Sequence, residues 1–588
     1  MLSKLLFIIG KDYYTRFVIL FFLMLIGTFV EMLSIGVIPV FVLSITDADL
    51  FVQKTNEFFS INLYDYIDAK SLVYYSGLIF FAAFVLKNLY LLFLTYYQGK
   101  LRMKLRETNK LKLFKVYLFL PYKFHLDLNP SLLTRNIISM TTAASDTFFH
   151  IINIFKEILV LIGVLILIYL NDISIYSILI ILILGTACYL FYALTKKRVN
   201  EAGQKFKFFS GKELKDLSQA FFSIKETKIS SKENFFHELE KKNVFGIELN
   251  KFRSSFISSM PRLFLEVITI LILTLFLTIF VLKDSNLSLI LPTLALVFAS
   301  VLRLIPAFNT ITSRFSDVVF SRAAVDLVYK ELKKNIYIQK EYNQANQIDH
   351  KDKFKFKNIS VKDLNFSYEN KKDAIKNFNM EILSNQKIGI LGKSGSGKTT
   401  FIDLLIGLHK PSSGAIFFNN INIHSKIKNW QNKIGYVPQN LYLFDDTILS
   451  NITFGEDEKK IDHEKFKKAV KIARIENFIS GLEFKENTII GNNGVRISGG
   501  ERQRIGIARA LYKMPEILIF DESTSSLDSE NEKIIMNEID QLDYNCTKII
   551  ISHKLNPLVN CDQIYLFDNG EIIERGNIDK IKKKYFII

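Results

Sequence analysis

Six long apolar segments dominate the first 310 residues of this 588-residue chain. They run over residues 17–43, 72–97, 148–170, 173–195, 262–282 and 286–308. A helix of roughly 20 apolar residues is long enough to span the hydrocarbon core of a bilayer. Because a backbone inside lipid must satisfy its hydrogen bonds internally, we expect six membrane-spanning helices.

The connections between these segments predict how the chain crosses the membrane. Residues 98–147 and 196–261 are strongly basic, whereas residues 44–71 carry more acids than bases. Basic loops stay on the cytosolic side, so the N-terminus and everything after residue 310 should be cytosolic. The first segment follows Lys4, Lys11 and Arg16 and has no small-residue cleavage site, so we predict a retained helix rather than a signal peptide.

The charge and the cysteines limit the functional classes. The formal net charge is +17, but the bases gather between apolar segments, where they face anionic lipid. Without a nucleic-acid-binding motif, we expect no nucleic-acid partner. The three cysteines, Cys188, Cys546 and Cys561, have neither metal-ligand nor redox spacing.

Two regions outside the apolar segments have their own predicted structure. Residues 49–66 lie on the external side, where they form either a short amphipathic helix at the membrane surface or a loop packed on the domain. We expect the membrane domain over residues 1–330, a polar linker over 331–356 and a soluble domain over 357–588. In that last part strand-like and helix-like runs alternate, which is typical of an α/β fold.

The soluble part contains the pattern G-x-x-x-x-G-K-[ST] between an apolar strand, 386–391, and an amphipathic helix, 400–407. Backbone N–H groups of such a loop surround a polyphosphate, and the helix that follows directs its positive end at the same anion. Lys398 would reach the β- and γ-phosphates, and Thr399 would hold Mg²⁺. The predicted nucleotide-binding residues here are Gly392, Lys393, Ser394, Gly395, Ser396, Gly397, Lys398, Thr399 and Thr400.

Two further patterns support ATP hydrolysis. Residues 517–522 form a buried hydrophobic strand that ends in two carboxylates, of which Asp521 is placed to bind Mg²⁺ and Glu522 to act as general base on the attacking water. The sequence Ser498-Gly499-Gly500-Glu501 is a second glycine turn that opens a helix, and therefore a second anion site.

With these motifs the chain resembles the ABC transporters, whose signature sequence is LSGGQ, and as a whole it is similar to an exporter-type half-transporter. The resemblance implies a six-span helical membrane domain followed by an α/β P-loop ATP-binding cassette in a bacterial inner membrane. It also implies that two cassettes pair head to tail in a homodimer. Ser498 and Gly500 of one copy then contact the γ-phosphate of ATP bound by Lys398 of the other.

The resemblance assigns roles to further residues. Tyr368 matches the aromatic residue that stacks on adenine, Gln439 the glutamine that contacts Mg²⁺, and His553 the switch histidine at the γ-phosphate. Residues 525–528 match the loop between the two ATP sites, and coupling helices are implied near residues 120–132 and 215–231. The chain departs from the family at Glu501, at Asn492-Asn493 and at Lys554.

Charged residues within the apolar segments bear on what is transported. Lys87, Arg262 and Arg303 come out at nearly one level in the inner half of the bilayer, counted at about 1.5 Å per residue. They either extend to inner-leaflet phosphates, with Arg262 and Glu266 as an i,i+4 pair, or form a cationic ring for a phosphate or pyrophosphate head group.

Sequence blocks at residues 31–39, 260–266, 302–306 and 436–444 are similar to those of lipid-linked oligosaccharide flippases of the PglK type. That similarity implies outward flipping of a polyprenyl-pyrophosphate glycan, although Thr310 stands where the family has an arginine. An exporter of another lipid, a drug or a peptide is the alternative, and an ATP-gated channel or sensor is a third.

Overall fold

The computed structural model describes residues 1–59, 68–169, 174–281, 287–334, 356–368, 373–491, 494, 497–522, 529–542 and 544–585. Contacts within the chain divide it into two compact units. One consists of residues 1–120 and 124–338, and the other of residues 121–123 and 339–588. The first unit is helical and the second is α/β.

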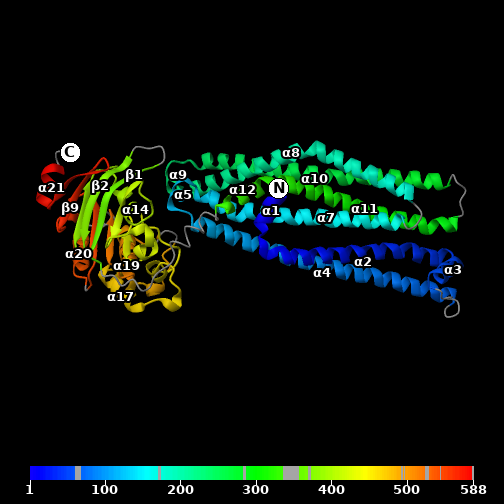
Figure 1. Cartoon of the computed structure of the whole chain (residues 1–588), viewed down its shortest axis with the longest axis horizontal. Coiled ribbons are helices and arrows are strands. Elements are labelled where there is room, and N and C mark those ends of the chain that lie inside the picture. The colour runs from blue at the N-terminus through cyan, green and yellow to red at the C-terminus, as the bar shows by residue number, and fades with distance from the viewer. Residues whose placement is uncertain are drawn as a thin grey trace. The chain divides into compact units, whose positions relative to one another are not determined.

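Six long helices make up most of the helical unit, one for each predicted apolar segment. These are α2 (Tyr14–Thr46), α4 (Ala69–Leu118), α7 (Thr141–Tyr169), α8 (Ser174–Phe222), α10 (Glu233–Val281) and α11 (Leu287–Phe320). Figure 1 shows them side by side, with α2 against α4, α8 against α10 and α7 against α11. Among the described residues, four helical segments are long and apolar enough to cross a membrane: 11–46, 70–118, 130–169 and 294–320.

The basic connections are mostly helical, which corrects the expectation of loops there. Helix α4 continues to Leu118, α8 continues to Phe222, and α10 already begins at Glu233. An apolar run marks only the part of a helix that lies in lipid, and the same helix continues as long as its remaining residues tolerate helical geometry.

Short helices precede, connect or follow the long ones. They are α1 (Leu2–Ile9), α3 (Ala48–Phe59), α5 (Tyr122–Asp127), α6 (Pro130–Arg135), α9 (Ile224–Ile229) and α12 (Arg322–Lys333). Helices α5 and α9 fall at the positions predicted for coupling helices. Helix α3 is the predicted external helix, and its Phe51 and Val52 pack against Leu72; residues 60–66 lie outside the described part.

The α/β unit contains two sheets. The strands are β1 (Asn358–Ser367), β2 (Asp373–Leu383), β3 (Lys387–Gly392), β4 (Ser413–Phe418), β5 (Ile421–Asn422), β6 (Ile434–Val437), β7 (Ile517–Asp521), β8 (Thr547–Ser552), β9 (Gln563–Asp568) and β10 (Glu571–Gly576). One sheet has the order β2-β1-β4-β5 and is antiparallel. The other has the order β10-β9-β3-β8-β7-β6, and its strands are parallel except for β10.

The larger sheet has hydrophobic cores on both faces, as a mostly parallel sheet requires. Ile517 and Ile519 of β7 belong to one core, and Leu518 and Phe520 of the same strand belong to the other. The helices of this unit are α14 (Lys398–Leu405), α15 (Ile427–Asn432), α16 (Ile448–Thr453), α17 (His463–Ile472), α18 (Glu476–Ser480), α19 (Gly499–Tyr512), α20 (Ser529–Asp540) and α21 (Ile578–Tyr585).

Candidate ATP-binding and hydrolysis site

The predicted phosphate-binding loop follows β3, which is fully buried between β8 and β9. Gly397 ends the loop with φ +102°, and a side chain there would press against the carbonyl oxygen of Ala374. Gly395 has φ +82°, and a Cβ atom at that position would meet nothing within 4 Å. The loop therefore needs glycine for its conformation, and at Gly395 it faces open space that an anion can fill.

Lys398 lies folded under this loop. Its Nζ donates hydrogen bonds to the carbonyl oxygens of Gly392 and Lys393, each at 2.8 Å, and lies 3.9 Å from the Glu522 carboxylate. The side chain is 6% exposed, and this burial lowers the pKa of the ammonium group. A polyphosphate in the loop would add negative charge beside the buried ammonium group and favour its charged form.

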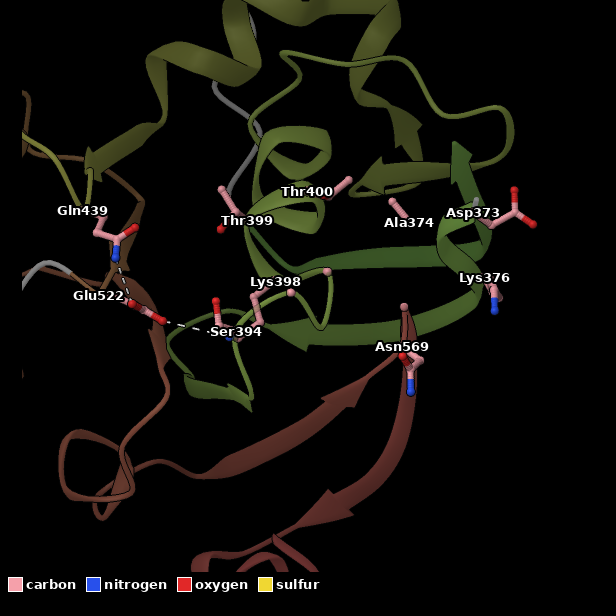
Figure 2. A pocket seen from close by; sticks show the side chains of 13 residues that line it. Asp373, Ala374, Lys376, Ser394, Lys398, Thr399, Thr400, Gln439, Glu522 and Asn569 are labelled. Carbon is pink, nitrogen blue, oxygen red and sulfur yellow. Dashed lines mark hydrogen bonds and ion pairs between the residues drawn. The ribbon is translucent and has the colours of Figure 1, made fainter. Parts of the chain in front are cut away.

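A cavity of about 500 Å³ opens over the loop (Figure 2). Eight predicted residues line it: Ser394, Gly395, Gly397, Lys398, Thr399, Thr400, Gln439 and Glu522. Asp373, Ala374, Lys376, Asn569 and Gly570 also line it, and the sequence analysis missed all five. They come from the start of β2 and the β9–β10 turn, and no local pattern connects these segments to the phosphate loop.

The residues that follow three neighbouring parallel strands meet at the Glu522 carboxylate, which lines this cavity. Glu522 follows β7, Gln439 follows β6, and His553 follows β8. Gln439 Nε2 donates a hydrogen bond to Glu522 at 3.0 Å, and His553 Nδ1 lies 3.4 Å from the same carboxylate. The backbone of Glu522 has φ +48°, a conformation rarely adopted by a residue with a side chain. Strand topology thus gathers the three predicted catalytic residues around one carboxylate.

Asp521 lies behind this cluster and is 4% exposed. Its carboxylate accepts a hydrogen bond from the Tyr436 hydroxyl at 3.1 Å. Burial raises the pKa of Asp521, although the Tyr436 hydrogen bond opposes this effect. A bound cation would favour the ionised form.

The oxygen atoms that side chains offer in and beside the cavity fit a magnesium ion that is also bound by the phosphates of a nucleotide. Thr399 and Gln439 offer neutral oxygens, and Asp521 offers a carboxylate. Within the described residues, no group of three or more His, Cys, Asp and Glu side chains could hold a metal ion. Mg²⁺ in phosphate-transfer sites takes only one or two protein carboxylates and completes its shell with phosphates and water.

Several predicted binding residues do not line the cavity. Tyr368 lies beside it, with its hydroxyl 3.3 Å from the Thr400 hydroxyl. Gly392, Lys393 and Ser396 form the body of the loop, and the buried hydroxyl of Ser396 has no hydrogen-bond partner in the described part of the chain. The loop thus retains an unsatisfied polar group close to where phosphate would bind.

The second glycine turn, Ser498 to Glu501, is not among the residues that line the cavity. It forms the N-terminus of α19, where Ser498 Oγ accepts the Glu501 N–H at 3.3 Å and the Glu501 carboxylate accepts the Ser498 N–H at 2.8 Å. This reciprocal pair is a capping box. Glu501, which replaces the usual glutamine, therefore stabilises the start of the helix; Asn492, Asn493 and residues 525–528 lie outside the described residues.

The cations predicted for substrate binding lie in two places. Arg303 on α11 donates hydrogen bonds to Glu31 on α2 at 2.8 and 3.1 Å, and to Glu157 on α7 at 3.0 Å. Both carboxylates are less than 10% exposed. Lys87 lies within electrostatic range of Glu31 and Arg303, and its Nζ is 4.2 Å from the centre of the Phe84 ring.

Arg262 stands apart from that cluster. It forms an ion pair with Glu266 at 3.0 Å, as the i,i+4 spacing predicted, and its side chain is 65% exposed. Arg262 and Arg303 therefore both have carboxylate partners, and the geometry favours paired charges over a ring of free cations. Glu157 was not among the predicted residues, although an acid inside an apolar segment is a signal for such a pair.

Comparison with known proteins agrees with this architecture. Residues 375–525 match the family model described as ABC transporter. A solved structure, "Structure of a bacterial Atm1-family ABC exporter with ATP bound", superposes with a TM-score of 0.80 over 98% of each chain at 20% identity, which shows the fold of the whole chain. The chain therefore has the fold of an ABC exporter, with a helical region followed by an ATP-binding cassette domain.

The chain is similar to proteins named ATP-dependent lipid A-core flippase. The one from Wigglesworthia glossinidia brevipalpis is 29% identical over 505 residues, which are 84% of this chain and 83% of the relative. The one from Saccharophagus degradans is 35% identical over 296 residues, 50% of this chain and 48% of the relative. The one from Francisella tularensis subsp. tularensis strain SCHU S4 is 38% identical over 220 residues, 37% of this chain and 36% of the relative.

Proposed function

We propose that this exporter uses ATP to flip a lipid-linked glycan outward across a bacterial inner membrane. The observation that carries the proposal is the similarity to a lipid A-core flippase over 83% of that protein, a length that must include membrane helices as well as the ATPase domain. A polyprenyl-pyrophosphate oligosaccharide is the proposed substrate, since it combines a long lipid with an anionic linkage and a glycan.

At the ATP site, we assign binding to the loop residues and hydrolysis to the cluster at the strand ends. Lys398 holds the β- and γ-phosphates, Tyr368 stacks on the base, and Glu522 accepts a proton from the attacking water. Gln439 and His553 orient the Glu522 carboxylate, which both approach within 3.4 Å. Thr399, Gln439 and Asp521 would hold Mg²⁺, which would supply positive charge to the phosphates.

The working protein is proposed to be a homodimer. The Ser498–Glu501 turn presents the N-terminus of α19 but is absent from the lining of the loop cavity of its own chain. A second copy would bring Ser498, Gly499 and Gly500 to the γ-phosphate. Each ATP would then be bound between two cassettes, and α5 and α9 would transmit the closure to the membrane helices.

For the substrate, Lys87 is the cation best suited to meet an anionic head group. Its ammonium group rests on the face of Phe84, whereas Arg303 and Arg262 are held by carboxylates. We assign Arg303 to the pyrophosphate site, where it binds substrate after its release from Glu31 or Glu157. Arg262 is assigned to the membrane edge of that site.

Flipping by purified protein in proteoliposomes tests this proposal. Fluorescent undecaprenyl-pyrophosphate glycan should become accessible to an external probe with ATP and the wild-type chain. The Glu522→Gln variant should bind ATP but lose activity by about 100-fold or more. Glu516→Gln is the matched control. Glu516 lies one residue before β7, the strand that Glu522 follows, and forms an ion pair with Lys433.

Two results would contradict the proposal. Unchanged ATPase activity in Glu522→Gln would refute the hydrolytic assignment. ATPase stimulation by members of a drug panel, without any movement of the glycan, would instead identify a drug exporter.

A further inference from the structure

A second cavity, of about 480 Å³, lies within the helical unit between α8, α11 and α12. It is separate from the Arg303 cluster, none of whose members line it. Ten residues line it and none is acidic, whereas three of them, Lys196, Lys197 and Arg322, are cationic. The cavity therefore has a strongly positive lining.

Apart from Asn200, the rest of the lining is mainly apolar. Tyr192 and Phe315 meet edge to face with ring centres 4.3 Å apart, and Val318 is buried beside them. The ammonium group of Lys196 lies 5.3 Å from the centre of the Tyr192 ring. One side of the cavity thus suits hydrocarbon, while the other suits an anion.

Two neighbouring acids are already engaged elsewhere. Asp317 on α11 binds Arg314 at 3.1 Å and faces His150, and Asp326 on α12 binds Lys4 at 2.6 Å. Across the part of the chain that the structure describes, no ion pair involves any of the three cavity cations. An external anion would therefore meet little competition from the protein.

The cavity also lies at the depth of a lipid head group. Lys196 directly follows the apolar segment that ends at Thr195, and Arg322 begins α12, which follows α11 along the chain. Basic pockets between helices on the cytosolic side of a membrane bind anionic lipid head groups.

We propose that this cavity binds an anionic phospholipid of the inner leaflet. The phosphate lies among Lys196, Lys197 and Arg322, and the first part of an acyl chain lies on Tyr192 and Phe315. Such a lipid would connect α8 to α11 and α12. This resident lipid is distinct from the transported molecule, so the inference does not depend on the identity of the cargo.

Native mass spectrometry of the full-length protein in detergent, with an equal mixture of phosphatidylglycerol and phosphatidylcholine, tests the proposal. The wild-type chain should retain phosphatidylglycerol at least about tenfold over phosphatidylcholine, and the combined variant Lys196→Gln, Lys197→Gln and Arg322→Gln should lose that preference. A matched control changes Arg198, Lys205 and Arg253 to Gln. These three line a neighbouring cavity of α8 and α10 that also contains Glu201, so the preference should persist.

Added glycerol 1-phosphate distinguishes a lipid site from a simple anion site. It should not displace phosphatidylglycerol at millimolar concentration, because it lacks the acyl chain that contacts the aromatic rings. Displacement would overturn the lipid assignment. Equal retention of phosphatidylglycerol by the triple variant, when that variant elutes as a monodisperse peak, would overturn the site itself.

Discussion

The carboxylate of Asp521 influences the charge of a second acid, Asp403. Asp403 lies on α14, the helix that follows the loop. Burial, and in second place the negative charge of Asp521, raise the pKa of Asp403 to about 6. The site thus keeps a second acid partly neutral near the proposed magnesium ligand.

Replacing Asp403 with asparagine should stabilise the protein at neutral pH. The folded pKa lies above the ordinary value of 3.8, so the folded state binds more protons and wild-type stability falls as the pH rises from about 4 to 6. Asp403→Asn should unfold at a higher temperature than wild type above about pH 6, and the difference should shrink toward pH 4. A difference independent of pH, measured by differential scanning fluorimetry, would contradict the assignment.

Residues whose role follows from a local sequence pattern could be predicted. Residues whose role depends on partners far away in the sequence could not. The phosphate loop is eight consecutive residues, so its pattern carries its geometry. Arg303 was found as a charge in an apolar segment, but its partners are 272 and 146 positions away in the sequence. Periodicity contains no information about which helices meet at Arg303.

The Arg303 cluster predicts a stability effect rather than a simple loss of binding. Arg303→Ala removes the partner that Glu31 and Glu157 share and leaves Glu157 only Lys156 at 3.7 Å, and breaking a buried ion pair costs about 3–5 kcal/mol. The melting temperature in detergent should fall clearly. Arg262→Ala removes only an exposed pair and should change it little.

A combined variant separates structure from substrate binding at Arg303. Arg303→Ala with Glu31→Gln and Glu157→Gln should recover much of the lost stability, because neither buried carboxylate remains without Arg303. If glycan flipping stays absent in this stable variant, Arg303 contacts the substrate. A single Arg303→Ala variant as stable as wild type would contradict the paired cluster.

At the scale of elements, the close approach of α8 and α11 depends on one glycine. A Cβ atom at Gly203 would overlap the carbonyl oxygen of Phe320, the last residue of α11. Gly99 on α4 is also helical, but a Cβ atom there would meet nothing within 4 Å. The two positions therefore form a natural comparison.

Gly203→Ala should destabilise the helical unit, because backbone atoms of α11 must move to accommodate the methyl group. The expected cost is about 1–3 kcal/mol, seen as a lower melting temperature and lower yield of monodisperse protein. Gly99→Ala should be neutral or slightly stabilising, since alanine favours helix. Equal effects at both positions would show that α8 and α11 do not approach each other as described.

The apolar segments predicted which helices exist but not where they end. Hydrophobicity marks the lipid-embedded stretch, whereas the cytosolic continuation depends on packing between α8 and α10 and between α4 and its neighbours. Helix α1 was missed because its eight residues precede the first long apolar segment. Its Leu5, Ile8 and Ile9 are buried, which a three- to four-residue apolar spacing would have indicated.

For the whole molecule, the central prediction is that two copies share each ATP site. In a mixed dimer with Lys398→Ala in one copy and Ser498→Arg in the other, both lesions fall in one shared site and the other site is intact. About half the ATPase activity should remain if the sites act independently. Placing both substitutions in one copy beside a wild-type copy disables both sites and should abolish activity.

Differently tagged chains, purified through both tags, allow this measurement. If the dimer with one substitution in each copy were inactive and the dimer with one wild-type copy were active, each chain would hydrolyse ATP alone. The sequence predicted the two kinds of domain from motifs and hydrophobicity. That two copies share each ATP site was inferred only from the resemblance to ABC transporters, because the sequence of a single chain contains no pattern that identifies its partner.

Because α8 and α10 are long, a small tilt of either helix at the membrane produces a larger displacement at its far end. Each contains 49 residues and is therefore roughly 73 Å long, of which a bilayer covers about 30 Å. Roughly 40 Å of each helix extends beyond the lipid as a stiff arm. A tilt of about 10° at the membrane would displace the free end of either helix by roughly 7 Å.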